Sequence, residues 1–107
     1  MFTKGNTLPY SDLGGGVSRK VLSFEKELMC VEVAFKDGAI GAIHTHPHIQ
    51  VSYVLSGKFE VTVGNEKAIL QKGDTFSVKK DEPHGVICLE EGVLLDYFTP
   101  MREDFIK

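Results

Sequence analysis

The chain has 107 residues, enough for one domain spanning residues 1–107 but too few for two. Its 42% hydrophobic and 25% charged residues are typical of a globular protein and exclude a disordered one. The net charge of -3, without a basic stripe, predicts no nucleic-acid partner. No apolar run approaches the ~20 residues needed to cross a bilayer, so no membrane partner is expected either.

The first ten residues, MFTKGNTLPY, contain no apolar stretch of the kind found in secretory signals. We therefore expect a cytoplasmic protein. The two cysteines, Cys30 and Cys88, lie in apolar runs and form no Cys-x-x-Cys motif. This placement predicts two buried free thiols.

The predicted secondary structure is a succession of short β-strands. No helical period persists for three turns, whereas β-rich runs alternate with turn residues. The runs, in chain order, cover 19–24, 28–35, 41–46, 51–56, 58–63, 67–71, 75–78, 84–89 and 92–99. Nine or ten strands at such even spacing predict an all-β sandwich or closed barrel. The tail from about residue 100 follows Pro100 and is expected to form at most a turn of helix.

Three of the four histidines lie in one short segment, HTHPH. Because alternate residues of a strand face the same side, His44 and His46 can point at one spot. His48 and Gln50 keep the same parity, and His84 follows a turn far along the chain. Imidazoles in this pattern suit zinc, copper, iron or nickel. The alternative is an exposed polar loop.

These residues resemble the first cupin motif, G-x5-HxH-x3,4-E-x6-G. The matching positions run from Gly38 to Gly57, with glutamine at the usual glutamate position. The second motif is matched in outline by Gly73, Pro83 and His84, without its interior Pro-x-Gly. The resemblance implies a cupin-type jelly-roll β-barrel. It also implies one divalent transition metal, nickel, zinc, iron or manganese, held by four side chains: His44, His46, Gln50 and His84.

The glutamine is a departure with chemical consequences. A neutral amide oxygen at Gln50 would leave the ion's charge uncompensated, which strengthens it as a Lewis acid and favours an anionic substrate. The departure also removes the carboxylate of the two-histidine-one-carboxylate iron oxygenases. Dioxygen chemistry on three histidines with iron or copper nevertheless remains an alternative function.

The similarity extends over nearly the whole chain to the KdgF-type cupins of pectin and alginate breakdown. It rests on DLGGGVSRKVL, HPHIQVSYVLSGKFEVTVG and EPHGVICLEEGVLLDYFTPMREDF. The resemblance implies an isomerase-like enzyme that converts 4,5-unsaturated uronates from the ring form to the open-chain keto form. It also implies that Asp96, Phe98 and Arg102 are the acting residues. A small anionic sugar acid would be the substrate.

Each of these residues also has an ordinary structural explanation. Asp96 would shuttle protons, unless it faces solvent from an edge strand. Phe98 would shape the pocket, or simply fill the core. Arg102 would clamp the substrate's carboxylate, or lie solvated in the tail. His48 either contacts the substrate or faces solvent.

Two further expectations concern assembly and the class of function. A barrel of this size has a small core and exposed strand edges, which predicts a homodimer. A binding or sensing cupin without turnover is the remaining alternative to an enzyme. Sensory cupins usually carry a partner domain, and this chain has no room for one.

Overall fold

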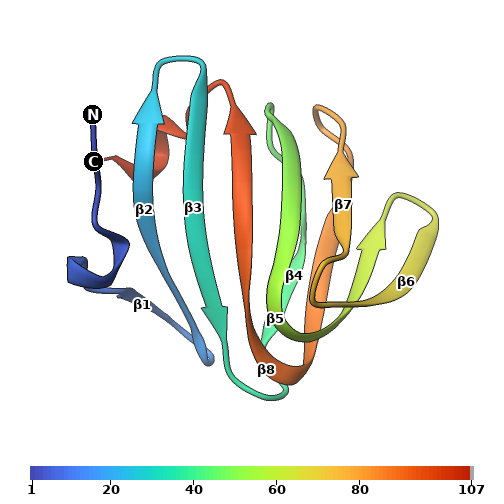
Figure 1. Ribbon diagram of the computed structural model, residues 1–107. Helices are drawn as coiled ribbons and strands as arrows, with labels where there is room; N and C mark the ends of the chain where they lie inside the picture. Colours follow the sequence, from blue (N-terminus) through green and yellow to red (C-terminus); the bar gives the residue numbers. More distant parts are fainter. Residues whose placement is uncertain (107) are drawn as a thin grey trace.

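The computed structural model describes residues 1–106, which form an all-β fold of antiparallel strands (Figure 1). Short 3-10 turns, η1 (Gly5–Thr7) and η2 (Glu103–Phe105), lie near the two ends of the chain. The eight strands are β1 (Ser11–Gly14), β2 (Val17–Glu25), β3 (Leu28–Phe35), β4 (Ile40–His44), β5 (Ile49–Val63), β6 (Glu66–Gln71), β7 (Thr75–Val78) and β8 (His84–Thr99). None of the helical turns within residues 1–106 has the length and apolarity required to traverse a bilayer.

The last strand, β8, closes the fold into a jelly-roll barrel. The strands follow the order β1-β2-β3-β8-β5-β6, while β4 joins β8 and β7 joins β5. The first part of β8 pairs with β4 and its second part with β3, and β5 runs antiparallel along both parts. The two long strands therefore bend and take part in both layers of the barrel (Figure 1).

The predicted number of strands, nine or ten, was wrong because two pairs of predicted strands are continuous, while β1 was not predicted. Segments 51–56 and 58–63 form the single strand β5, and 84–89 and 92–99 form β8. The bend is made by Gly57, whose φ is +82°, opposite Gly92. A Cβ on Gly92 would lie 2.2 Å from the Ser56 carbonyl oxygen. Glycine here allows two backbones to cross closely without ending either strand.

The core follows from the alternation of apolar residues along the strands. On β3 every second side chain is buried, from Met29 to Phe35, and Phe35 meets Phe59 of β5 edge-to-face at 5.3 Å between ring centroids. Burying each such side chain stabilises the fold by about 1.5–3 kcal/mol. Toward one end of the barrel the buried residues become polar. They are His46, Gln50, Ser52 and His84.

Both cysteines are free, as predicted, but only Cys88 is buried. Cys30 is half-buried because its β3 position alternates with the inward-facing Met29 and Val31. It pairs with Tyr97 of β8, which is also partly exposed.

Candidate metal centre

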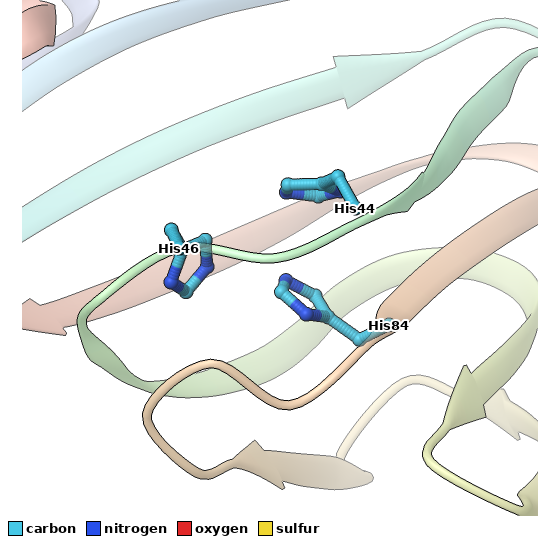
Figure 2. Close-up of side chains that lie close together, drawn as sticks. All are labelled: His44, His46 and His84. Carbon is cyan, nitrogen blue, oxygen red and sulfur yellow. The ribbon is translucent and has the colours of Figure 1, made fainter.

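Three histidines from two parts of the chain lie close together (Figure 2). His44 is the last residue of β4, and its backbone pairs with that of His84, the first residue of β8. His46 lies in the loop between β4 and β5. One ring nitrogen from each histidine lies within 4.8 Å of the others. The pairing of β4 with β8 therefore brings together residues that are 40 positions apart.

The other ring nitrogens are held by hydrogen bonds. Nδ1 of His44 donates to the Ala42 carbonyl at 2.8 Å, and Nδ1 of His84 donates to the Glu82 carbonyl at 2.9 Å. Each bond fixes a tautomer whose Nε2 carries a free lone pair. Nε2 of His46 donates to Gln50 Oε1 at 2.9 Å, which leaves its Nδ1 free.

These free nitrogens fit a metal ion. His46 Nδ1 and His84 Nε2 are both buried without a hydrogen-bond partner among residues 1–106. Buried polar atoms normally have a partner, and a bound cation would provide one for both. Burial lowers the pKa of His84 to about 4 and also lowers that of His46. Both rings are therefore neutral at pH 7, in the form that binds metals.

The cluster is built from imidazole nitrogens. No aspartate or glutamate in the described part of the chain joins the three histidines. Gln50 borders the cluster through its bond to His46. Its role as a fourth ligand remains a prediction.

A chain of hydrogen bonds links the histidines to Asp96. Gln50 Nε2 donates to Ser52 Oγ at 2.9 Å, and Ser52 Oγ donates to Asp96 Oδ1 at 2.6 Å. The register of β5 against β8 places Ser52 directly opposite Asp96. Ser52 is fully buried and was missed by the sequence analysis, although it shares the inward parity of Gln50.

Asp96 has an unusual proton affinity. Burial raises the pKa of its carboxyl to about 6, while the Ser52 hydrogen bond and the charges of Arg102 and His44 act in the opposite direction. A carboxyl with a pKa near neutrality can both accept and donate a proton under physiological conditions. Asp96 therefore has the properties of an acid–base group.

A cavity of about 310 Å³ collects most of the predicted site residues. Its apolar wall includes side chains from β2, β3 and β8. The predicted residues on its surface are His44, Gln50, His84, Asp96, Phe98 and Arg102. His46 does not line this cavity but is hydrogen-bonded to Gln50, which does.

The C-terminal tail forms one side of this cavity. Phe98 is buried with its ring centroid 5.5 Å from that of His46. Arg102 stacks over the ring of Phe105 at 4.2 Å from its centroid. The two guanidinium nitrogens Nε and Nη2 of Arg102 bind the two carboxylate oxygens of Asp104 at 3.1 and 2.9 Å. In this structure the fork of Arg102 is therefore already engaged by a carboxylate of its own chain.

A second arginine, Arg19 of β2, also lines the cavity and was missed by the sequence analysis. Its guanidinium carbon lies 3.7 Å from the centroid of Phe105. Arg19 shares strand parity with Val17 and Val21, so an inward-facing cation was visible in the sequence pattern.

His48 lies beside the site rather than on the surface of the cavity. It is half-buried, and its ring centroid lies 5.4 Å from that of His46 and 6.3 Å from that of Phe98. Its Nδ1 is buried without a partner among residues 1–106.

Comparison with known proteins gives consistent results. Residues 31–98 match the family model described as "Cupin domain". The chain is 48% identical over 100 residues to the pectin degradation protein KdgF of Dickeya dadantii, covering 92% of this chain and 91% of that protein.

Two solved structures are similar over nearly their full length. KdgF from a Halomonas species superposes with a TM-score of 0.95 at 36% identity, covering 98% of this chain and 97% of the other. An RmlC-like cupin from Shewanella frigidimarina superposes with a TM-score of 0.94 at 44% identity, covering 97% of this chain and 94% of the other.

Proposed function

The chain belongs to the cupin family, as a small cupin of the KdgF type, and from that premise we propose that it opens 4,5-unsaturated uronates to their keto form. The observation that carries the proposal is one shared cavity. A histidine cluster suited to a metal, a carboxyl with a pKa near 6 and two arginines all border it. The similarity to a pectin degradation protein supports a sugar acid as the substrate.

The proposed reaction needs one proton to move and no redox step. A 4,5-unsaturated uronate is a cyclic enol ether that carries a hemiacetal and a carboxylate. The hemiacetal hydroxyl loses its proton as the bond from C1 to the ring oxygen breaks, which leaves an aldehyde and an enolate on the former ring oxygen. Protonation of C4 then converts the enolate to the ketone, so the proton lost from oxygen is regained on carbon.

Asp96 is the group we assign to this proton transfer. As a carboxylate it accepts the hydroxyl proton, and as a carboxylic acid it returns a proton to C4. The pKa of about 6 suits both roles near neutral pH. The Ser52 hydroxyl, bonded to Oδ1, holds the carboxyl in place within the wall of the cavity.

The three histidines, with Gln50 beside them, would hold the metal. A divalent ion bound there supplies Lewis acidity for the substrate's oxygen atoms. Gln50 positions His46 through its amide oxygen and Ser52 through its amide nitrogen. A glutamate could not donate the second of these bonds, so glutamine suits both the hydrogen-bond chain and an anionic substrate.

Phe98 and Arg102 complete the proposed substrate contacts. The buried ring of Phe98 forms an apolar wall next to His46 and excludes water there. Arg102 contributes positive charge. It binds the substrate carboxylate after releasing the carboxylate of Asp104.

The decisive experiment mixes metal-loaded protein with freshly released 4,5-unsaturated uronate. We expect faster loss of the ultraviolet absorbance of the enol ether than in buffer alone, with no oxygen consumed. Oxygen uptake at the same rate would instead indicate the dioxygenase alternative. An unchanged rate would remove the enzyme proposal and leave a binding protein.

We also propose that the chain forms a homodimer. Several large apolar side chains are exposed on the outer faces of the strands, including Ile40, Ile43 and Ile69. Covering such surface with a second copy would add to a small core. Light scattering should give a mass of about twice 11.8 kDa at micromolar concentration, whereas the monomer mass would refute the dimer.

A further inference from the structure

The second arginine of the cavity has no task in the function proposed above. Resting on that function, we propose that Arg19 binds the carboxylate of the sugar-acid substrate together with Arg102, and that Arg19 thereby selects acids over neutral sugars. The assignment rests on the position of Arg19, its free hydrogen-bond donors and the charges around it.

The position follows from the register of the sheet. Arg19 of β2 pairs with Val33 of β3, which in turn pairs with Leu94 of β8. All three line the same cavity, and Asp96 lies two residues beyond Leu94 on β8. Arg19 therefore lines the cavity from the same sheet as the proposed acid–base group, two strands away from it.

The donors of Arg19 have no anionic partner. Among residues 1–106, no carboxylate lies within ion-pair distance of its guanidinium, and no hydrogen bond from its side chain is formed. Arg102, in contrast, has both of the donors on its fork engaged by Asp104. Phe105 stacks against Arg19, and such stacking leaves the N–H groups at the edge of the guanidinium plane available.

The local charges favour an incoming anion. The guanidinium groups of Arg19 and Arg102 lie over one phenyl ring, at 3.7 and 4.2 Å from its centroid. Burial and the nearby charge of Arg102 lower the pKa of Arg19, although Asp104 partly offsets this. A carboxylate bound to Arg19 would offset both the cost of burying this charge and its repulsion by Arg102.

The competing explanation is that Arg19 only packs against Phe105 and holds the tail. The variant Arg19→Met distinguishes packing from carboxylate binding, because the unbranched methionine side chain retains apolar contact with Phe105 but has no charge or hydrogen-bond donors. Lys at position 19 retains the charge but loses the planar fork. Lys72→Met removes one positive charge from the exposed β6–β7 turn and controls for net charge.

The test measures binding of D-galacturonate and D-galactose to the metal-loaded protein by NMR titration of backbone amides. These saturated sugars differ in the carboxylate and cannot undergo the proposed reaction. We expect Arg19→Met to raise the Kd for galacturonate about 10- to 100-fold, as loss of a charged hydrogen bond would. Arg19→Lys should show a smaller rise, and Lys72→Met should match the parent protein.

Three outcomes would overturn the proposal. They are an unchanged galacturonate Kd in Arg19→Met, an equal loss of galactose binding, and a parent protein that binds galactose as well as galacturonate. If Arg19→Met does not fold, the same criteria apply to Arg19→Lys. Because both sugars are unreactive, a parent protein that fails to convert unsaturated uronate would refute the proposed function without deciding the role of Arg19.

Discussion

The histidine cluster and the arginine rim, which comprises Arg19, Arg102 and Phe105, border the same cavity but are held in different ways. In the cluster, each histidine has one ring nitrogen fixed by a backbone carbonyl or by Gln50. In the rim, two guanidinium groups lie on one aromatic ring of a short 3-10 turn, and an exposed carboxylate holds one of them.

This difference suggests two tasks. Ligands whose second nitrogens are fixed keep a constant geometry, which suits an ion that stays bound. Stacked arginines with one exchangeable partner can admit and release an anion. The predictions below test this division, beginning with the largest expected effect.

Removing ligands from the histidine cluster should abolish metal binding. We expect the double variant His46→Ala/His84→Ala to lose bound metal and all measurable conversion, while circular dichroism still reports a β-fold. His48→Ala is the matched control, since His48 is not part of the three-histidine cluster, and it should keep its metal. Unchanged metal content in the double variant would refute the ligand assignment.

Asp96 links the two regions and should carry the next largest effect. Asp96→Asn keeps the size of the side chain but removes the acid–base group, so kcat should fall by roughly 10²–10⁴-fold with metal content unchanged. Rate measurements paired with metal analysis check this. A variant that turns over at the parent rate would leave Asp96 with a structural role only.

The rim should respond more weakly. Arg102→Lys keeps the charge but loses the two-point pairing geometry, so KM for the uronate should rise by about tenfold, with a smaller change in kcat. Steady-state kinetics separate the two constants. A change confined to kcat would argue that Arg102 acts on the reacting atoms rather than on the bound carboxylate.

The last prediction concerns the stability of the metal-free protein. The pKa of Asp96 is about 6 when folded and about 3.9 in an unfolded chain, so the folded state holds this proton more tightly. The destabilising contribution of Asp96 therefore appears as the pH rises from about 4 through 6. Asp96→Asn has no such group and should be more stable than the parent by about 2 to 3 kcal/mol at pH 7.

Urea unfolding at pH 4 and pH 7, after treatment with chelator, measures this difference. The free energies of unfolding of the parent and of Asp96→Asn should be nearly equal at pH 4. A gap that does not depend on pH would contradict the raised pKa.

Local patterns in the sequence were enough to predict much of the fold. Alternating apolar residues predicted the all-β class and most of the strand segments, and the His-x-His spacing predicted two members of the cluster. Continuity through Gly57 could not be predicted from local signals, because a bend and a chain reversal use the same residue type there. The outcome depends on how closely Gly92 approaches from β8.

The missed site residues share another cause. Ser52 acquires its significance only when β5 is placed in register opposite Asp96. Arg19 and Phe105 are 86 positions apart, and no local pattern predicts their contact. The pairing of Arg102 with Asp104 is local, but both residues could equally have been solvated in an irregular tail.

The central place of β8 also has a consequence for the order in which the protein matures during synthesis. His84 and Asp96 lie on the strand that joins β3, β4 and β5, and it leaves the ribosome after these three strands. Until it arrives, the nascent chain has His44 and His46 but neither the third histidine nor the acid–base carboxyl. Because these distant segments must meet, closure is expected to be slow compared with local folding. Barrel closure, metal acquisition and the onset of activity should therefore occur together. A nascent chain without β8 should neither bind the metal tightly nor catalyse the reaction.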